Sequence, residues 1–261
     1  MPNLDTRTTK TPAVDDYTYL LSNDGTVEGK VELQDVTVIP ETTRTINFTS
    51  SQTATQIQAE IDSVGKYIPQ GATITFQFGN GTYTLDNIII FQGFYGGGSF
   101  FIYGDTTQTN ALHTNHNVHL DFNNNSDGIL IRGLGTAVSV VAHLRVTVDQ
   151  GYTGIIYTRC PFYNLCRYHY ITAGSSASSE SRGIEVIESS AIYLISSYFS
   201  AGYYAIYTTV NSRVISNGND DTGTQPLYGL TAFTNSTIGK NGTQPSGSTS
   251  NEIINTGGVI R

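Results

Sequence analysis

The sequence predicts an all-β protein, a parallel β-solenoid with one short helix near its N-terminal end. Three observations support this prediction. Short runs of β-branched and aromatic residues are separated by Gly, Asn and Asp, as strands are by turns. From about residue 118 such runs recur every 22 to 29 residues, counted between the starts at Gly128, Gly154, Gly183, Ala205 and Gly229. Charged residues make up only 13 % of the chain, about half the usual share.

The charge and hydropathy of the chain exclude several classes of function. The net charge is −8 and the 13 Lys and Arg residues are scattered, whereas nucleic-acid binding needs a basic face. No apolar stretch reaches the length of about 20 residues that a transmembrane helix needs, so membrane insertion is not expected. Residues 1–5 lack the basic and apolar regions of a signal peptide. We therefore expect a protein made in the cytosol of its producer and released by lysis, without a cofactor.

Residues 1–40 differ from the rest of the chain and are predicted to form an adaptor segment. Asp24-Gly25 is a tight-turn signal, and the partial alternation around it predicts a small hairpin over residues 15–36. An isolated two-stranded hairpin is marginal in water. The segment is therefore expected to need a surface on which to dock.

Residues 41–117 are predicted to hold a capping helix and the start of the solenoid. Apolar residues between 53 and 68 recur at three- and four-residue steps, which marks one face of a helix. Thr53 and Gln56 form a capping-box pattern, and Pro69 ends the helix. Because an open solenoid end exposes strand edges, we expect this helix to cap the N-terminal end. The strands expected after the helix are 73–78, 82–85, 88–90 and 100–103.

The whole solenoid is predicted to have about five or six rungs, and residues 118–261 are predicted to form its rungs and the C-terminal cap. Each repeat starts with a small residue and an aliphatic one, as in Gly183-Ile184, which suits a tight corner followed by an inward-pointing stack. A second pair follows six residues later and suits the next bend, because Ser and Asn side chains bond the backbone of turns. These pairs are Cys160-Pro161, Ser189-Ser190, Asn211-Ser212 and Asn235-Ser236. Two residues further, Tyr163, Val214 and Ile238 are expected to align, with Tyr193 one place along from them.

One stretch of the chain resembles a known family. Phe78-Gly-Asn-Gly-Thr-Tyr-Thr-Leu, followed by Ile88-Ile-Ile and Phe101-Ile-Tyr-Gly, resembles the start of the right-handed, pectate-lyase-like β-helix of bacteriophage tailspikes and related virion proteins. The later Gly-Ile and Asn-Ser turns are similar to the rungs of that superfamily. The resemblance implies a virion structural protein, a homotrimeric appendage such as a head or tail fibre or a spike, for decoration or host-surface adhesion.

The same resemblance implies the partners of the chain. They are further copies of itself, another phage structural protein bound through residues 1–40, and a host-surface glycan. The residues expected to anchor the chain to the virion are Tyr17, Tyr19, Leu20, Leu21, Val31 and Leu33.

The alternative function is a depolymerase tailspike, which cleaves bacterial surface polysaccharide with paired carboxylates. Hydrolysis of this kind needs two carboxylates about 5–9.5 Å apart. Glu185 and Glu188 fall on one rung, but a spacing of three residues places them on opposite faces of a strand. Asp220-Asp221 lies in a loop-like stretch and is interpreted as a solvated turn. The sequence therefore favours a protein without enzymatic activity, and a free polysaccharide lyase is disfavoured further because no Asp set lies in register across rungs.

Two groups of metal-binding or redox-active residue types occur. His113, His116 and His119 lie within seven residues and are candidate metal ligands. The favoured interpretation is a polar turn before a strand at 118–122, with no metal. Cys160 and Cys166 are able to form a disulfide, but two buried thiols are favoured in a reduced compartment.

The chain is rich in aromatic residues, with 17 Tyr and 11 Phe but no Trp. Tyr has an apolar ring for a sugar or a protein and a hydroxyl for hydrogen bonding. Five tyrosines crowd one rung and the corner after it, namely Tyr193, Tyr198, Tyr203, Tyr204 and Tyr207. They are candidates for glycan contact or for subunit packing, and the sequence favours neither over the other.

Overall fold

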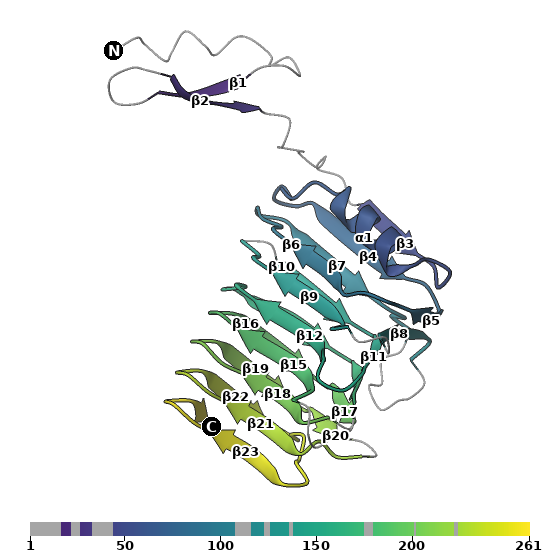
Figure 1. The fold of residues 1–261 in the computed structure, drawn as a ribbon, viewed down its shortest axis with the longest axis vertical. Helices are drawn as coiled ribbons and strands as arrows, with labels where there is room; N and C mark the ends of the chain where they lie inside the picture. The colour runs from purple at the N-terminus through teal and green to yellow at the C-terminus, as the bar shows by residue number, and fades with distance from the viewer. Residues whose placement is uncertain are drawn as a thin grey trace.

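The chain folds as a solenoid of three parallel sheets whose strands stack side by side from β3 to β23 (Figure 1). The computed structural model describes residues 17–21, 27–32, 44–107, 116–122, 126–135, 138–174, 180–200, 202–221 and 224–261. The chain visits a nine-stranded, a six-stranded and a seven-stranded sheet in turn, and each strand pairs in parallel with its equivalent in the next rung. The predicted parallel β-solenoid is confirmed, while its handedness stays a prediction.

The three sheets have the following strands. The nine-stranded sheet consists of β3 (Arg44–Phe48), β4 (Thr73–Phe78), β7 (Ser99–Tyr103), β10 (Val138–Ala142), β13 (Tyr163–Arg167), β16 (Ala191–Ile195), β19 (Arg213–Asn217), β22 (Thr237–Asn241) and β24 (Val259–Ile260). The six-stranded sheet consists of β5 (Gly81–Thr84), β8 (Val118–Phe122), β11 (Arg145–Val148), β14 (Tyr170–Ala173), β17 (Tyr198–Ser200) and β20 (Asp220–Asp221). The seven-stranded sheet consists of β6 (Ile89–Gln92), β9 (Ile129–Arg132), β12 (Thr153–Thr158), β15 (Arg182–Ile187), β18 (Tyr204–Thr208), β21 (Tyr228–Ala232) and β23 (Ser250–Ile254).

The strand register reproduces the repeat starts found in the sequence. One stack of buried aliphatic side chains in the seven-stranded sheet contains Ile129, Ile155, Ile184, Ile206 and Leu230. The residue before each of them is small because neighbouring rungs approach closely at this corner. A Cβ on Gly128 would lie 2.2 Å from the carbonyl oxygen of Gly154, which no real side chain tolerates.

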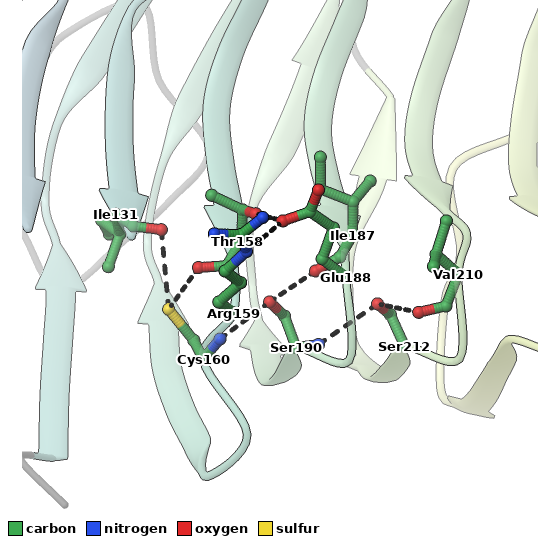
Figure 2. A network of polar contacts seen from close by, with 9 residues as sticks. All are labelled: Ile131, Thr158, Arg159, Cys160, Ile187, Glu188, Ser190, Val210 and Ser212. Atoms are coloured by element: carbon green, nitrogen blue, oxygen red, sulfur yellow. Dashed lines mark hydrogen bonds and ion pairs between the residues drawn. The ribbon is translucent and has the colours of Figure 1, made fainter. Parts of the chain in front are cut away.

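A ladder of serine hydroxyls holds the corner between the seven-stranded and nine-stranded sheets (Figure 2). The Oγ of Ser190 accepts a hydrogen bond from the Cys160 N–H at 3.0 Å. The Ser190 N–H donates in turn to Ser212 Oγ, and the Ser212 N–H donates to Ser236 Oγ, both at 3.2 Å. The predicted bend at the second pair is therefore confirmed.

The alignment expected for Tyr163 after this bend is wrong, whereas Tyr193 lies one place along, as expected. Tyr163 pairs with Ala191, and Tyr193 pairs with Ile215. The residues that do stack inward at this point are Asn164, Ile192, Val214 and Ile238. Because side chains alternate with a period of two, an offset of one residue moves each tyrosine to the outer face.

The solenoid is longer than the expected five or six rungs. Nine strands stack in the longest sheet, which gives about eight turns between its first and last strand. The additional rungs lie in residues 41–117, where β6 begins without the Gly-Ile pair that marks later rungs. One continuous core, from Ile46 to Ile238, fills residues 41–117 and 118–261 alike.

The helix α1 (Ala54–Asp62) caps the N-terminal edge of the seven-stranded sheet, as predicted. The capping box between Thr53 and Gln56 is present. The side-chain amide of Gln58 pairs with the backbone of β6: its Oε1 accepts from the Ile90 N–H at 2.7 Å, and its Nε2 donates to the Ile90 carbonyl at 3.0 Å. One amide thus satisfies the backbone groups that another strand would otherwise pair with.

The helix ends at Asp62 and not at residue 68, so its predicted length is wrong. The Ser63 hydroxyl donates to the Glu60 carbonyl at 2.7 Å and occupies an oxygen that a continuing helix would use. Gly65 follows and is a poor helix former. Ile68 is still buried, because the segment after the helix bridges to Tyr95.

The predicted N-terminal hairpin is present. β1 (Tyr17–Leu21) and β2 (Val27–Glu32) pair antiparallel, with Tyr17 opposite Glu32. The proposed anchor residues Tyr17, Tyr19, Leu20, Leu21 and Val31 lie in these two strands, whereas Leu33 and the Asp24-Gly25 turn lie outside the described residues. The docking role of this segment stays a prediction.

Candidate functional site

The outer face of the seven-stranded sheet carries a cluster of aromatic rings. Arg182 of β15 pairs with Tyr204 of β18, which pairs with Tyr228 of β21, so the three side chains stand in one column. Glu185 and Tyr207 form the next column on the same two strands. Adjacent strands lie about 4.8 Å apart, which brings such neighbours into contact. We name the cluster the tyrosine patch; it consists of Arg182, Tyr203, Tyr204, Tyr207, Tyr228 and Phe233.

The rings of the tyrosine patch form a continuous chain of contacts. Tyr203 lies 4.7 Å from Tyr204 and 5.2 Å from Tyr228, measured between ring centroids. Tyr207 lies 5.1 Å from Tyr204 and 5.6 Å from Phe233. These are the distances at which aromatic pairs attract each other. Tyr204 is only 8 % exposed and forms the floor, while the other rings are more open to solvent.

Arg182 links the rings to two carboxylates. Its guanidinium carbon lies 4.6 Å from the centre of the Tyr207 ring, a cation–π contact. Its Nη2 lies 2.8 Å from Glu180 and its Nη1 lies 3.4 Å from Glu185. The Glu180 side chain is 69 % exposed, so it remains accessible to a ligand.

Glu185, which borders the tyrosine patch, has a raised pKa. Burial raises the pKa of Glu185, Arg182 lowers it, and the charge of Asp127 raises it further. The carboxylate of Asp127 itself accepts the Thr153 N–H at 2.7 Å. The net direction is upward, which leaves Glu185 easier to protonate than an ordinary glutamate.

This arrangement suits the binding of a sugar. Tyrosine rings offer apolar faces with hydroxyls at their edges, and the guanidinium and carboxylates offer strong hydrogen bonds to hydroxyl groups. The groups stand on parallel strands of a packed solenoid, so they are preorganised.

Glu188, the other predicted acid of this rung, belongs to the corner and not to the patch. Its Oε2 accepts from Thr158 Oγ1 at 2.8 Å and from Arg159 Nε at 2.7 Å (Figure 2). The hydrogen bond from Thr158 is the main cause that lowers the pKa of Glu188. Glu185 and Glu188 therefore have separate partners, because Glu188 lies in the corner that follows β15 and not on the strand itself.

Asp220 and Asp221 form the short strand β20 and not the solvated turn that was expected. They pair with Tyr198 and Phe199 of β17. The Oδ1 of Asp221 accepts from the Ser246 hydroxyl at 2.9 Å, which ties the strand to the following segment. Asp220 and Asp221 are therefore part of the stacked six-stranded sheet.

The five predicted tyrosines are divided among the three sheets. Tyr203, Tyr204 and Tyr207 meet in the tyrosine patch. Tyr193 lies on the outer face of the nine-stranded sheet, where its hydroxyl accepts from Asn217 Nδ2 at 3.2 Å. Tyr198 lies on the six-stranded sheet, and burial followed by the charge of Asp220 raises its pKa.

The histidine candidates do not form a metal site in the part of the chain that is described. His113 lies outside the described residues. His116 is buried before β8, and His119 points outward from β8, with Nε2 2.9 Å from Thr147 Oγ1. No group of three or more metal-ligating side chains occurs among the described residues. The predicted strand at 118–122 is confirmed as β8.

Both cysteines are buried free thiols, as favoured from the sequence. Burial raises the pKa of Cys160 to about 11 and that of Cys166 to about 12. Thiols with such pKa values are unreactive at neutral pH, so neither is a catalytic nucleophile.

Sequence reasoning missed three residues of the patch: Arg182, Tyr228 and Phe233. Each lies on a rung next to that of Tyr204 or Tyr207. Arg182 and Tyr228 are each more than 20 residues from Tyr204 in the sequence. The only available signal was the repeat itself, since Arg182, Tyr204 and Tyr228 hold equivalent places relative to their repeat starts.

Comparison with known proteins gives no relative. No family model matches the chain, and no curated protein or solved structure matches it. Among the described residues, no helix is long and apolar enough to cross a membrane. The function is therefore inferred from the side chains of the site itself.

Proposed function

We propose that this chain is a bacteriophage virion structural protein, a homotrimeric fibre or spike whose solenoid adheres to a host-surface glycan. The tyrosine patch is the observation that supports this proposal most directly. Its rings, Arg182 and the exposed Glu180 carboxylate offer sugar-binding groups on a rigid face. The N-terminal hairpin β1–β2 supplies a separate element through which residues 1–40 would join another phage protein.

The charges of the patch restrict the glycan. Arg182 is balanced by Glu180 and Glu185, so it offers no uncompensated positive charge to an acidic polysaccharide. We therefore expect neutral or amino-sugar residues at the site.

Glycan binding is tested with a panel of immobilised capsular polysaccharides and lipopolysaccharides. Tyr207→Ala and Tyr228→Ala are each expected to weaken binding by about tenfold, because each removes a ring from the platform. Tyr95→Ala is the matched control, since Tyr95 is 44 % exposed and lies near α1, outside the patch. Equal binding by wild type and patch variants, or no binding to any member of the panel, would refute the adhesion function.

The virion location is tested by immunogold electron microscopy of purified particles with antibody raised against residues 70–261. Label at a fixed place on the particle is the expected result. Absence of label on intact particles with a full protein complement would overturn the structural role.

A depolymerase is the second candidate, favoured by Glu185, whose side chain is only 13 % exposed. A carboxyl whose pKa is raised by burial is able to act as a general acid near neutral pH. If the chain releases reducing ends from a bound polysaccharide, Glu185→Gln is expected to abolish the release. Glu188→Gln is the control and is expected to retain it, because Glu188 belongs to the corner. Release at wild-type rate by Glu185→Gln would remove Glu185 as the acid.

A further inference from the structure

The outer face of the nine-stranded sheet carries an apolar stripe that follows the axis of the solenoid. Five successive strands, from β7 to β19, place one side chain each in a single outward column. These side chains are Phe101, Val140, Leu165, Tyr193 and Ile215, and we name them the apolar stripe. All five are uncharged: Ile215 is 36 % exposed, Phe101, Leu165 and Tyr193 are partly buried, and Val140 between them is 8 % exposed.

Exposed apolar side chains extend the stripe to its sides. Beside Leu165, Phe162 is 51 % exposed and Tyr163 is 49 % exposed. Single exposed apolar residues are normal, but a contiguous patch marks an interaction surface.

The charges around the stripe have the layout of a protein interface. The strands of this sheet contain no Asp or Glu among the described residues. Their charged side chains beside the stripe are Arg167 and Arg213, each one outward position away from it along the strand. An apolar centre with arginine at its border is the usual composition of such surfaces. The seven-stranded sheet, in contrast, presents Arg182 and Glu185 on its outer face.

The size of the face suits a stable homo-oligomer. Strands are about 4.8 Å apart and residues about 3.3 Å apart, so nine strands of about five residues outline a face of about 43 by 16 Å. The five strands of the stripe take up about 24 Å of this length, so the whole face of roughly 700 Å², with the stripe at its centre, is what comes close to the about 800 Å² that each partner contributes to a standard interface.

The regular spacing of the side chains in the stripe indicates which kind of surface packs against it. Its side chains form ridges at the strand spacing, so a matching surface needs grooves with the same spacing over five rungs. A second copy of this chain with a parallel axis provides that spacing along its whole length. We propose that the apolar stripe is the surface through which copies of this chain pack against one another. This inference rests on the homo-oligomeric part of the proposed function and assigns it a surface.

The test measures the mass of the purified full chain by analytical ultracentrifugation over a wide concentration range. The wild type is expected to be oligomeric. Leu165→Asp and Ile215→Asp are each expected to weaken association about a hundredfold or more, because each buries an unpaired charge in the interface. Thr172→Asp is the matched control, since Thr172 is an outward residue of β14 on the six-stranded sheet. Circular dichroism checks that all variants are folded, and Ile215→Gln serves as a milder variant if an Asp variant unfolds.

The outcomes separate the inference from the function on which it rests. Oligomeric wild type with monomeric stripe variants and an oligomeric control supports the inference. Oligomeric stripe variants would show that the copies meet through another face, which overturns the inference and leaves the oligomeric appendage intact. A monomeric wild type would overturn both the inference and the oligomeric appendage. The stripe would then be expected to bind a different protein.

Discussion

At the scale of single residues, the fold depends on side chains that bond backbone groups at the corners. Ser190 accepts from the Cys160 N–H and donates to the Ile187 carbonyl at 2.7 Å (Figure 2). It is only 1 % exposed. A rung corner cannot use the strand ladder for these groups, so one hydroxyl per rung replaces it.

Ser190→Ala is expected to lower the free energy of unfolding by about 1–3 kcal/mol, because the buried Cys160 N–H loses its acceptor. The measurement is the urea midpoint. Ser200→Ala, on the outer face of β17, is the control and is expected to change stability by less than about 0.5 kcal/mol. Equal effects of the two substitutions would show that the ladder contributes nothing.

His169 is a second corner residue with a measurable consequence. It is fully buried, its Nε2 lies 2.9 Å from the Val141 carbonyl oxygen, and the charges of His116 and His143 act on it in addition to burial. Burial lowers the pKa of His169 to about 3 from 6.5. Below pH 6.5 the unfolded chain therefore binds a proton that the folded chain excludes.

The free energy of unfolding is expected to fall as the pH drops from about 6.5 towards 3, by up to about 1.4 kcal/mol per pH unit from His169 alone. His169→Asn should flatten this slope, since Asn219 occupies the equivalent corner two rungs later. Urea midpoints measured across this pH range test the prediction. A variant with the same slope as the wild type would contradict it.

At the scale of elements, α1 protects the edge strand β6 through one side chain. The Gln58 amide makes both hydrogen bonds to Ile90 that an added strand would make. The helix is nine residues long, and a helix of this length is marginal in isolation. Its stability therefore depends on this contact and on the burial of Ile57 and Ile61.

Gln58→Leu is expected to speed hydrogen exchange of the Ile90 amide by about tenfold, which corresponds to about 1.4 kcal/mol of local protection. Hydrogen-exchange mass spectrometry of peptides covering β6 is the measurement. Gln70→Ala, at an exposed glutamine, is the control and should leave exchange unchanged. Unchanged exchange in Gln58→Leu would mean that the sheet edge is protected by packing alone.

At the scale of the whole molecule, stability is built from stacked rungs that contact their immediate neighbours. Each rung contributes one inward residue per stack, and the stacks continue from rung to rung. Such proteins are close to one-dimensional in their energetics. Whole rungs are therefore the natural unit of insertion and deletion.

Deletion of residues 183–204 joins Arg182 to Ala205 and leaves Ile206 in the place of Ile184. We expect a shorter, folded solenoid of lower stability. Deletion of residues 183–205, one residue more, places Tyr207 at that inward position and reverses the alternation, so it should not fold. Circular dichroism and urea unfolding of the two deletion variants are the measurements. If both variants fold with the same stability, the alternation of inward and outward side chains does not control folding.

The sequence by itself determined the corners of this protein and the inward stack that begins each repeat. Gly-Ile starts, the Ser pairs at the bends and the capping box all act within a few residues, and the structure contains each of them. The exterior was decided by the tertiary structure. Which outward side chains meet depends on the register between rungs more than 20 residues apart, and one added residue at a corner reverses every side chain that follows. Tyr193 therefore belongs to the apolar stripe and Tyr207 to the tyrosine patch, although both occur in the same crowded stretch of sequence.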